Sequence, residues 1–178
     1  MNTQNCREST DVVLGQEFLT WLWYQSDTAP GAFTDKGGAP FSVSMEQRIV
    51  VQQGQGDARE ITSVTGSFSP LREARFGLGT GKKVSRALIR LEKEELAFQL
   101  TLKAEDFSLG SVKTPKLDTT DSVDDQDADA LLLEKLYLLE VCTDLLDALY
   151  SRFLQLRLSP AWRDEVAHIG RWLTCFDQ

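Results

Sequence analysis

SPLREARFGLGTGKKVSRALIRLE, residues 69–92, decides how this chain folds. Ser69 followed by Pro70 is a typical helix start, with serine as the N-cap and proline in the first turn. The glycine-rich segment after Leu78 is expected to end that helix. Lys82–Lys93 then reads as a strand with apolar residues on parts of both faces, which is typical of the centre of a sheet.

The same stretch opens the basic part of an otherwise acidic chain. From Pro70 to Lys116 there are ten lysines and arginines and six acids, a net charge of +4. The whole chain carries −8, so the remainder carries −12. A segregated positive surface is the minimum electrostatic footprint of a protein that binds a polyanion. The acidic total argues only against a protein that coats nucleic acid with its entire surface.

The length and amino-acid composition indicate a globular chain of ordinary size. Its 178 residues, 42% hydrophobic and 26% charged, fit one soluble domain, or a domain with an appended helical unit. The first dozen residues lack the features of a secretory signal, and no apolar run reaches the ~20 residues of a membrane helix. The cysteines at positions 6, 142 and 175 form no CxxC motif, which favours a reducing cytoplasm. Cys142 lies among leucines and is expected to be buried.

Further strands are expected on both sides of residues 69–92. Phe41–Gln53 alternates apolar and polar residues, as does Leu96–Lys103, which follows a tight turn at Glu94-Glu95. Arg59–Ser67 shows a weaker strand pattern. Residues 106–116 are expected to add a short edge strand, limited by a proline.

The first helix is predicted over Val12–Gln25, with Thr10 or Asp11 as its cap. Its apolar stripe is widened by three aromatic residues, Trp21, Trp23 and Tyr24. Core packing is one interpretation of this wide surface. The other is a partner or dimer interface, because so many aromatic residues and leucines in a small chain exceed what one core hides.

The C-terminal third is expected to be helical. Residues 117–129 contain six aspartates and form the acidic linker that precedes it. Residues 130–158 then predict one long helix or a broken pair, and Ser159-Pro160 starts a final short helix. The expected buried side of the long segment is Leu132, Leu136, Leu139, Leu146, Leu149, Phe153 and Leu156.

Together these patterns predict an α+β fold, in which an antiparallel sheet is flanked by helices and followed by a leucine-rich helical C-terminal unit. The expected organisation is an α+β domain over residues 12–116, an acidic linker over 117–129, and a helical unit over 130–175 that packs on the first domain.

Residues that carry chemistry are scarce. His168 is the only histidine and is expected on the surface, so no two-histidine metal site exists. Gly77–Lys82 resembles a phosphate loop only loosely, because Phe76 and Lys83 occupy positions where that motif needs glycine and a hydroxyl residue. A helix end with a tight turn is the simpler interpretation. The sequence predicts a non-enzymatic protein without metal or cofactor.

The basic residues allow two interpretations. In one, they line the polar side of a strand and pair with nearby glutamates. In the other, they contact phosphates of nucleic acid without reading sequence. The residues proposed for that contact are Lys82, Lys83, Arg86 and Arg90, with Arg72 and Arg75 from the preceding helix.

The order of these segments resembles a known family. LGQEFLTWLWYQS at 14–26, REARFGLGTGKKVSRALIRLEKEELAFQLTLKAEDFSLGSVKTP at 72–115, and LLLEKLYLLEVCTDLLDALYSRFLQLRLSPAW at 131–162 are similar to the C-terminal half of the recombination-associated protein RdgC family. The resemblance spans roughly Leu14 to Trp162, about half of a typical member.

This resemblance implies a non-enzymatic, bacterial, nucleoid-associated protein. Such proteins form a ring-like dimer that encircles double-stranded DNA without sequence preference and restrains recombination. Gly81, Lys82, Lys83 and Arg86 are then the expected DNA-facing positions. Expected partners are duplex DNA and either a homo-oligomer or a separately encoded N-terminal half that docks on the aromatic residues of the first helix. The alternative is a protein–protein adaptor that does not bind DNA.

Overall fold

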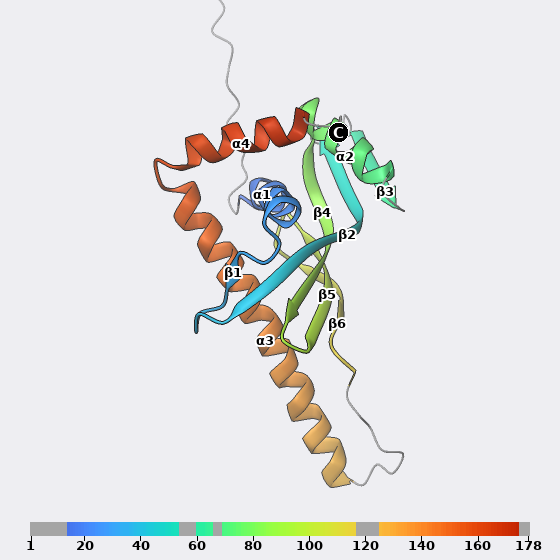
Figure 1. Ribbon diagram of the computed structural model, residues 1–178. Helices are drawn as coiled ribbons and strands as arrows, with labels where there is room; N and C mark the ends of the chain where they lie inside the picture. Colours follow the sequence, from blue (N-terminus) through green and yellow to red (C-terminus); the bar gives the residue numbers. More distant parts are fainter. Residues whose placement is uncertain (1–13, 54–59, 66–68, 117–124, 175–178) are drawn as a thin grey trace, which may run out of the picture.

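The structure is a computed structural model and describes residues 14–53, 60–65, 69–116 and 125–174 (Figure 1). It contains an open antiparallel sheet of six strands and four helices, which confirms the predicted α+β class. The strands are β1 Phe33–Thr34, β2 Pro40–Gln53, β3 Glu60–Thr65, β4 Lys83–Lys93, β5 Leu96–Lys103 and β6 Leu109–Lys113. The helices are α1 Gly15–Thr28, α2 Ser69–Gly79, α3 Asp125–Arg157 and α4 Trp162–Thr174.

The sheet is built around β4. It pairs with β2 on one side and, through the turn at Glu94-Glu95, with β5 on the other. β6 pairs with β5 and forms one edge, while β1 and β3 pair with opposite ends of the long β2. The expected central position of residues 82–93 is therefore confirmed.

The alternation of β4 and β5 produces one covered face and one open face. Phe98, Leu100 and Leu102 of β5 are buried, whereas the residues between them are partly exposed. β4 follows the same rule, with a bulge near Ser85 where the pairing with β2 shifts. All four helices lie on the covered face, where α1 crosses β4 and β2 (Figure 1).

The start of α1 differs from the sequence prediction. The N-cap position is Leu14, with φ 51° and no side-chain cap, rather than Thr10 or Asp11. Gly15 follows and passes very close to the end of β5, because a Cβ atom there would overlap the main-chain oxygen of Ala104. Close packing of the chain, rather than a polar cap, fixes this end of the helix.

The long C-terminal helix is continuous, and its buried stripe is not the one expected. α3 begins at Asp125, inside the segment predicted as linker, and its buried residues share one core with the sheet. That stripe is Leu138, Cys142, Leu145, Leu149 and Phe153. The prediction was wrong for Leu132, Leu136 and Leu139, which are exposed, because the N-terminal part of α3 projects beyond the sheet (Figure 1).

The helices of the described residues were also assessed for membrane insertion. None of the four has both the length and the apolar character needed to cross a bilayer.

Candidate nucleic-acid interface

The open face of the sheet carries basic side chains from the central strand. Lys83, Arg86 and Arg90 of β4 are all exposed. They lie opposite the buried residues Val84 and Leu91, on the face that the helices leave uncovered. Three of the six basic residues proposed from sequence therefore share one surface.

Strand pairing adds two lysines to this surface. Lys103 of β5 is the direct cross-strand partner of Arg86. Gln99 is the partner of both Arg90 and Lys113, so a row of three side chains crosses β4, β5 and β6. The basic face is therefore defined by Lys83, Arg86, Arg90, Lys103 and Lys113.

Within the described part of the chain, one ion pair forms on the basic face. Arg90 pairs with Glu92 at 2.7 Å, so the salt-paired interpretation holds for this residue. Glu92 is the only acid of β4, β5 and β6 on this face, and Ser42 also contacts it. Among the described residues, the other four basic side chains form no ion pair. Like charges that face each other across neighbouring strands oppose folding.

The Gly77–Lys82 turn is a helix end, as expected. The amide of Lys82 donates to the carbonyl of Gly77 at 3.0 Å, and that of Gly81 donates to Leu78 at 3.1 Å. These two bonds, with Gly81 at φ 93°, make a Schellman motif. The Lys82 side chain packs on Gly77 and is half-buried, so it lies at the border of the basic face.

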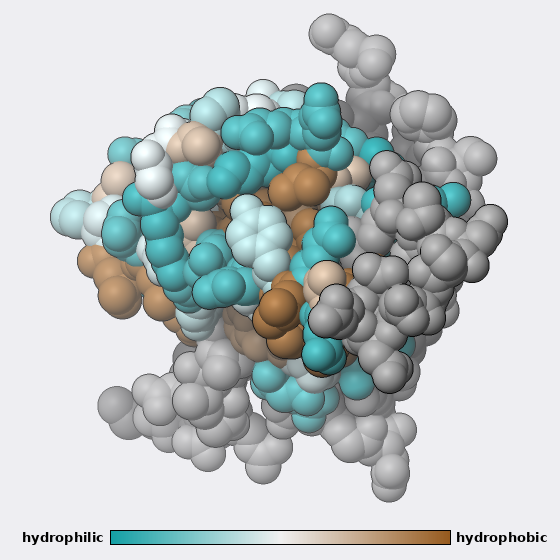
Figure 2. Space-filling view, turned by 90° about the horizontal axis from the view of Figure 1, so that it is seen from below, coloured by the Kyte–Doolittle hydropathy of each residue, from teal (hydrophilic) through white to brown (hydrophobic). Residues whose placement is uncertain are grey.

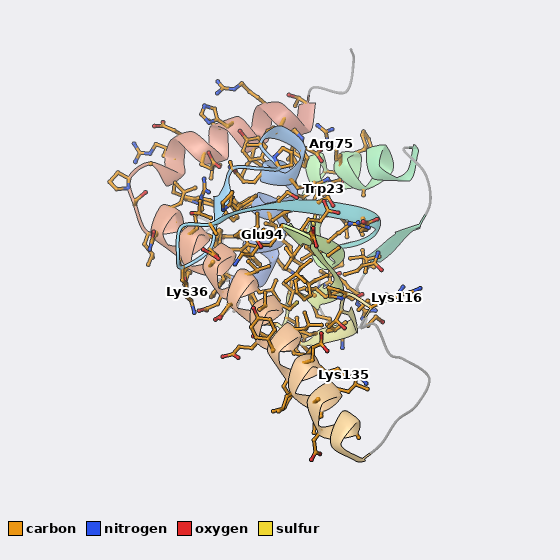
Figure 3. All side chains as sticks on the ribbon, turned by 60° about the horizontal axis from the view of Figure 1, so that its bottom comes forward. Trp23, Lys36, Arg75, Glu94, Lys116 and Lys135 are labelled. Atoms are coloured by element: carbon orange, nitrogen blue, oxygen red, sulfur yellow. The ribbon has the colours of Figure 1, made fainter. Side chains whose placement is uncertain are left out.

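Arg75, which the sequence analysis proposed as a DNA contact, does not belong to the basic face. Its side chain is 18% exposed and lies between α2 and the end of α4 (Figure 3). It donates to the main-chain oxygen of Trp172, stacks 4.3 Å from the Trp172 ring, and lies 3.9 Å from Asp27. Burial raises the pKa of Asp27, and the charge of Arg75 opposes that rise. The Arg72 side chain lies outside the described residues.

The aromatic residues of α1 belong mainly to the core. Trp21 and Trp23 are 0% and 1% exposed, so their expected role as an exposed docking surface is wrong. α4 closes over this side of α1: Trp172 lies edge-on to Trp23 at 5.4 Å and to the half-exposed Tyr24 at 5.8 Å. The core-packing interpretation explains the width of the apolar stripe on α1.

The sequence analysis did not propose Lys103 and Lys113 as members of the site. The position of Lys103 could nevertheless have been predicted from the sequence. A two-residue turn at Glu94-Glu95 makes Lys93 and Leu96 partners, and counting outward places Lys103 opposite Arg86. Lys113 was harder to place, because the pairing of β5 with β6 is irregular after Gln99.

Other candidate chemistry is limited. No cluster of three metal-ligating side chains occurs within the described residues. His168 is exposed on α4, 3.8 Å from Glu165. Cys142 is buried as predicted, and burial raises the pKa of its thiol to about 11, so the reactive thiolate is scarce at neutral pH.

The chain was also compared with known proteins. No protein-family model, no curated protein and no solved structure matches it. The functional interpretation of the basic face therefore rests on its own geometry and charge.

Proposed function

We propose that this chain is a non-enzymatic protein that binds double-stranded DNA without sequence preference, through the basic face. The observation that supports this proposal most strongly is the pairing of Arg86 with Lys103 beside three further basic residues, on the side of the sheet that no helix covers. Among the described residues, Arg90 alone of the five forms a salt bridge.

The dimensions of the basic face suit a nucleic-acid backbone. Arg86 and Arg90 are four residues apart on one strand, which places them roughly 13 Å apart. Arg90 and Lys113 are separated by one intervening strand, and therefore by roughly 10 Å. A duplex carries one charge per ~1.7 Å of its axis, so several phosphates lie within that span. Contacts with phosphates position a protein without reading bases.

The resemblance to the RdgC family makes this proposal more specific. The chain would modulate recombination as part of a dimer or ring, in the cytoplasm and associated with the nucleoid. Its partner would be a second copy or a separately encoded N-terminal half. With Trp21 and Trp23 in the core, such a partner would have to use a surface other than α1.

The test is the salt dependence of binding to a short random-sequence duplex, measured by fluorescence anisotropy. The oligomeric state is first fixed by light scattering. Up to five phosphate contacts predict micromolar binding at low salt and a log–log slope of about −4. An adaptor whose basic residues serve only local pairing would not bind the duplex at low salt, and that result would overturn the proposal.

A further inference from the structure

Three of the four exposed leucines of α3 form an ordered row, and the fourth, Leu133, lies outside it. Leu132, Leu136 and Leu139 are 55%, 52% and 41% exposed. They follow the alternating spacing of four and three residues that places side chains on one side of a helix. Figure 2 views the molecule from below and shows apolar side chains standing among hydrophilic ones on this face. An exposed apolar row of this kind marks an interaction site when it is joined to a concave surface.

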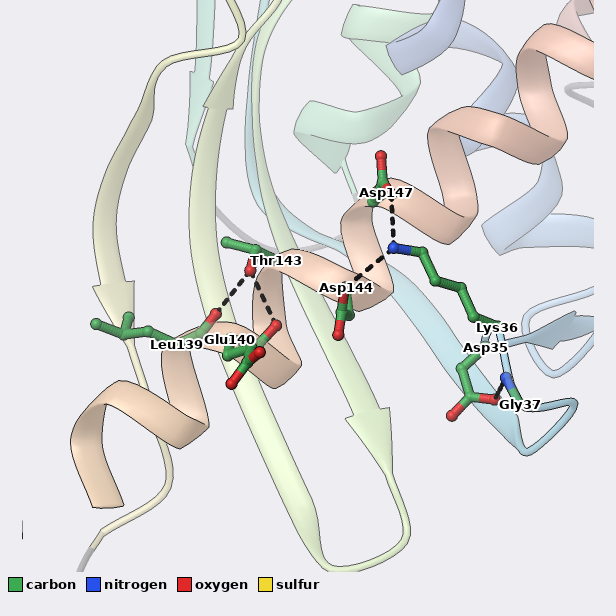
Figure 4. A network of polar contacts seen from close by, with 8 residues as sticks. All are labelled: Asp35, Lys36, Gly37, Leu139, Glu140, Thr143, Asp144 and Asp147. Carbon is green, nitrogen blue, oxygen red and sulfur yellow. Dashed lines mark hydrogen bonds and ion pairs between the residues drawn. The ribbon is translucent and has the colours of Figure 1, made fainter. Parts of the chain in front are cut away.

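Such a concave surface lies at the end of the row. The spacing continues through Thr143, Leu146 and Tyr150, which line a cavity of about 210 Å³. Its other walls come from the sheet side and α1: Phe18, Leu102, Phe107 and Leu109. In Figure 4, Leu139 and Thr143 point to the side of α3 that faces away from Lys36. The helical spacing therefore leads from the leucine row to the wall of the cavity, and the row and cavity together are called the α3 groove below.

The cavity suits one apolar side chain. Phe107 lies 4.7 Å from Tyr150 and 5.6 Å from Phe18, so aromatic rings form much of its wall. The Thr143 hydroxyl donates to carbonyls of its own helix, and Asp147 pairs with Lys36 at 2.8 Å (Figure 4). A dry cavity of ~150 Å³ holds a benzene ring, whereas drug-sized ligands occupy roughly 300 Å³ or more. The cavity volume lies between these values and fits a leucine or aromatic anchor.

The charges around the α3 groove favour a partner with a basic surface. Asp129 and Glu140 are exposed on one side of the leucine row, and Lys135 is exposed on its other side. Lys36 is already held by Asp144 and Asp147, which raise its pKa. A second copy of α3 would bring acidic side chains against acidic ones, which costs free energy. A basic partner complements this surface.

We propose that the α3 groove binds a basic amphipathic helix of another polypeptide, which inserts one leucine or aromatic side chain into the cavity. Anchors at i, i+3 or i+4, and i+7 of that helix would cover Leu139, Leu136 and Leu132 in turn. This docking site lies on α3, outside the basic face, and does not depend on DNA binding.

The test uses the native chain and a synthetic helix of roughly 18 leucines and lysines carrying one tryptophan. Binding is followed by tryptophan fluorescence and by amide NMR shifts. We expect the shifts to gather over residues 132–150. The double variant Leu136→Ser/Leu139→Ser should bind at least tenfold more weakly, while Leu158→Ser/Val166→Ser, a matched pair at exposed positions 79% and 49% accessible, should bind like the native chain.

Three results would overturn this proposal. Equal binding by the two double variants would show that charge alone attracts the peptide. Equal binding of a leucine–glutamate peptide would contradict the basic character of the partner. A native dimer that Leu136→Ser/Leu139→Ser converts to a monomer would show that a second copy covers the α3 groove.

Discussion

Arg86 on β4 and Lys103 on β5 are direct cross-strand partners on the open face of the sheet, so two cationic side chains stand side by side. Side chains in such a pair are about 5 Å apart at Cβ, and like charges there destabilise the sheet. Neither residue forms an ion pair among the described residues, but Lys103 interacts electrostatically with Asp106. The pair is therefore expected to cost stability, and under the proposed function a phosphate of DNA would relieve the repulsion.

The variant Lys103→Glu is expected to raise the stability of the protein while weakening its binding to DNA. The new glutamate would pair with Arg86, and we expect the free energy of unfolding to rise by about 0.5 kcal/mol. Binding to duplex DNA should weaken for all sequences, and the salt slope should fall by about 1. Urea denaturation and anisotropy measure the two effects. A variant that is more stable and binds DNA as well as the native chain would contradict the assignment of Lys103.

The variant Arg75→Ala is expected to lower the stability of the protein without changing its affinity for DNA. Removing this side chain leaves the carbonyl of Trp172 without its donor and the Trp172 ring without its stacked cation. We expect a loss of about 2 kcal/mol of stability with unchanged DNA affinity, provided that the protein remains folded at the temperature of the assay. Arg75→Lys serves as the companion variant, because lysine keeps the charge but not the planar stack. A selective loss of DNA binding by either variant would contradict the structural role of Arg75.

Gly15→Ala tests the close approach of α1 to β5. The added Cβ atom would overlap the main-chain oxygen of Ala104 and lie 2.7 Å from its carbonyl carbon. Because both neighbours are backbone atoms, we expect a loss of about 3 kcal/mol, measured by urea denaturation. Gly31→Ala is the control, since nothing lies within 4 Å of a Cβ atom there. Equal stability of the two variants would show that α1 does not pack as described.

Asp35 makes stability depend on pH. Its carboxylate accepts hydrogen bonds from Lys93 at 2.6 Å and from the amides of Ala39 and Gly37, and these contacts lower its pKa below 3.8. Its stabilising contribution is therefore complete above pH 3.8 and is lost as the pH falls through the lowered folded-state pKa. Asp35→Asn should unfold at a lower temperature than the native chain near neutral pH. The difference should vanish at acid pH, and a constant difference would contradict this account.

Much of the fold was predictable because its signals are local. The cap at Ser69 and the glycines after Leu78 mark the two ends of α2, and the alternation of Leu96–Lys103 specifies β5; both elements form as predicted. The buried side of α3 was not predictable in the same way. Leucines occupy more than one side of that helix, and only the position where the sheet ends decides which of them are covered.

The candidate site was predicted in part. Alternation along one strand predicts that Lys82, Arg86 and Arg90 share a face, and the structure agrees for Arg86 and Arg90. Lys83 shares that face because of the bulge near Ser85, and Lys82 lies at its border. Arg75 could not be placed, because its environment comes from Trp172, which is 97 residues away in sequence. Trp21 and Trp23 were ambiguous for the same reason, since Trp21 packs against Phe33 and Phe153 and Trp23 against Trp172.

The most direct test of the proposed DNA-binding role compares two triple charge reversals in the anisotropy assay. One changes Lys83, Arg86 and Lys103 of the basic face to glutamate. The other changes Lys135, Arg163 and Arg171, which are equally exposed residues of α3 and α4, and alters the net charge by the same amount. We expect the first variant to lose at least about 100-fold in affinity at low salt and the second to stay within about threefold of the native chain. An equal loss in both variants, or strong binding by the first, would contradict the claim that the basic face binds DNA.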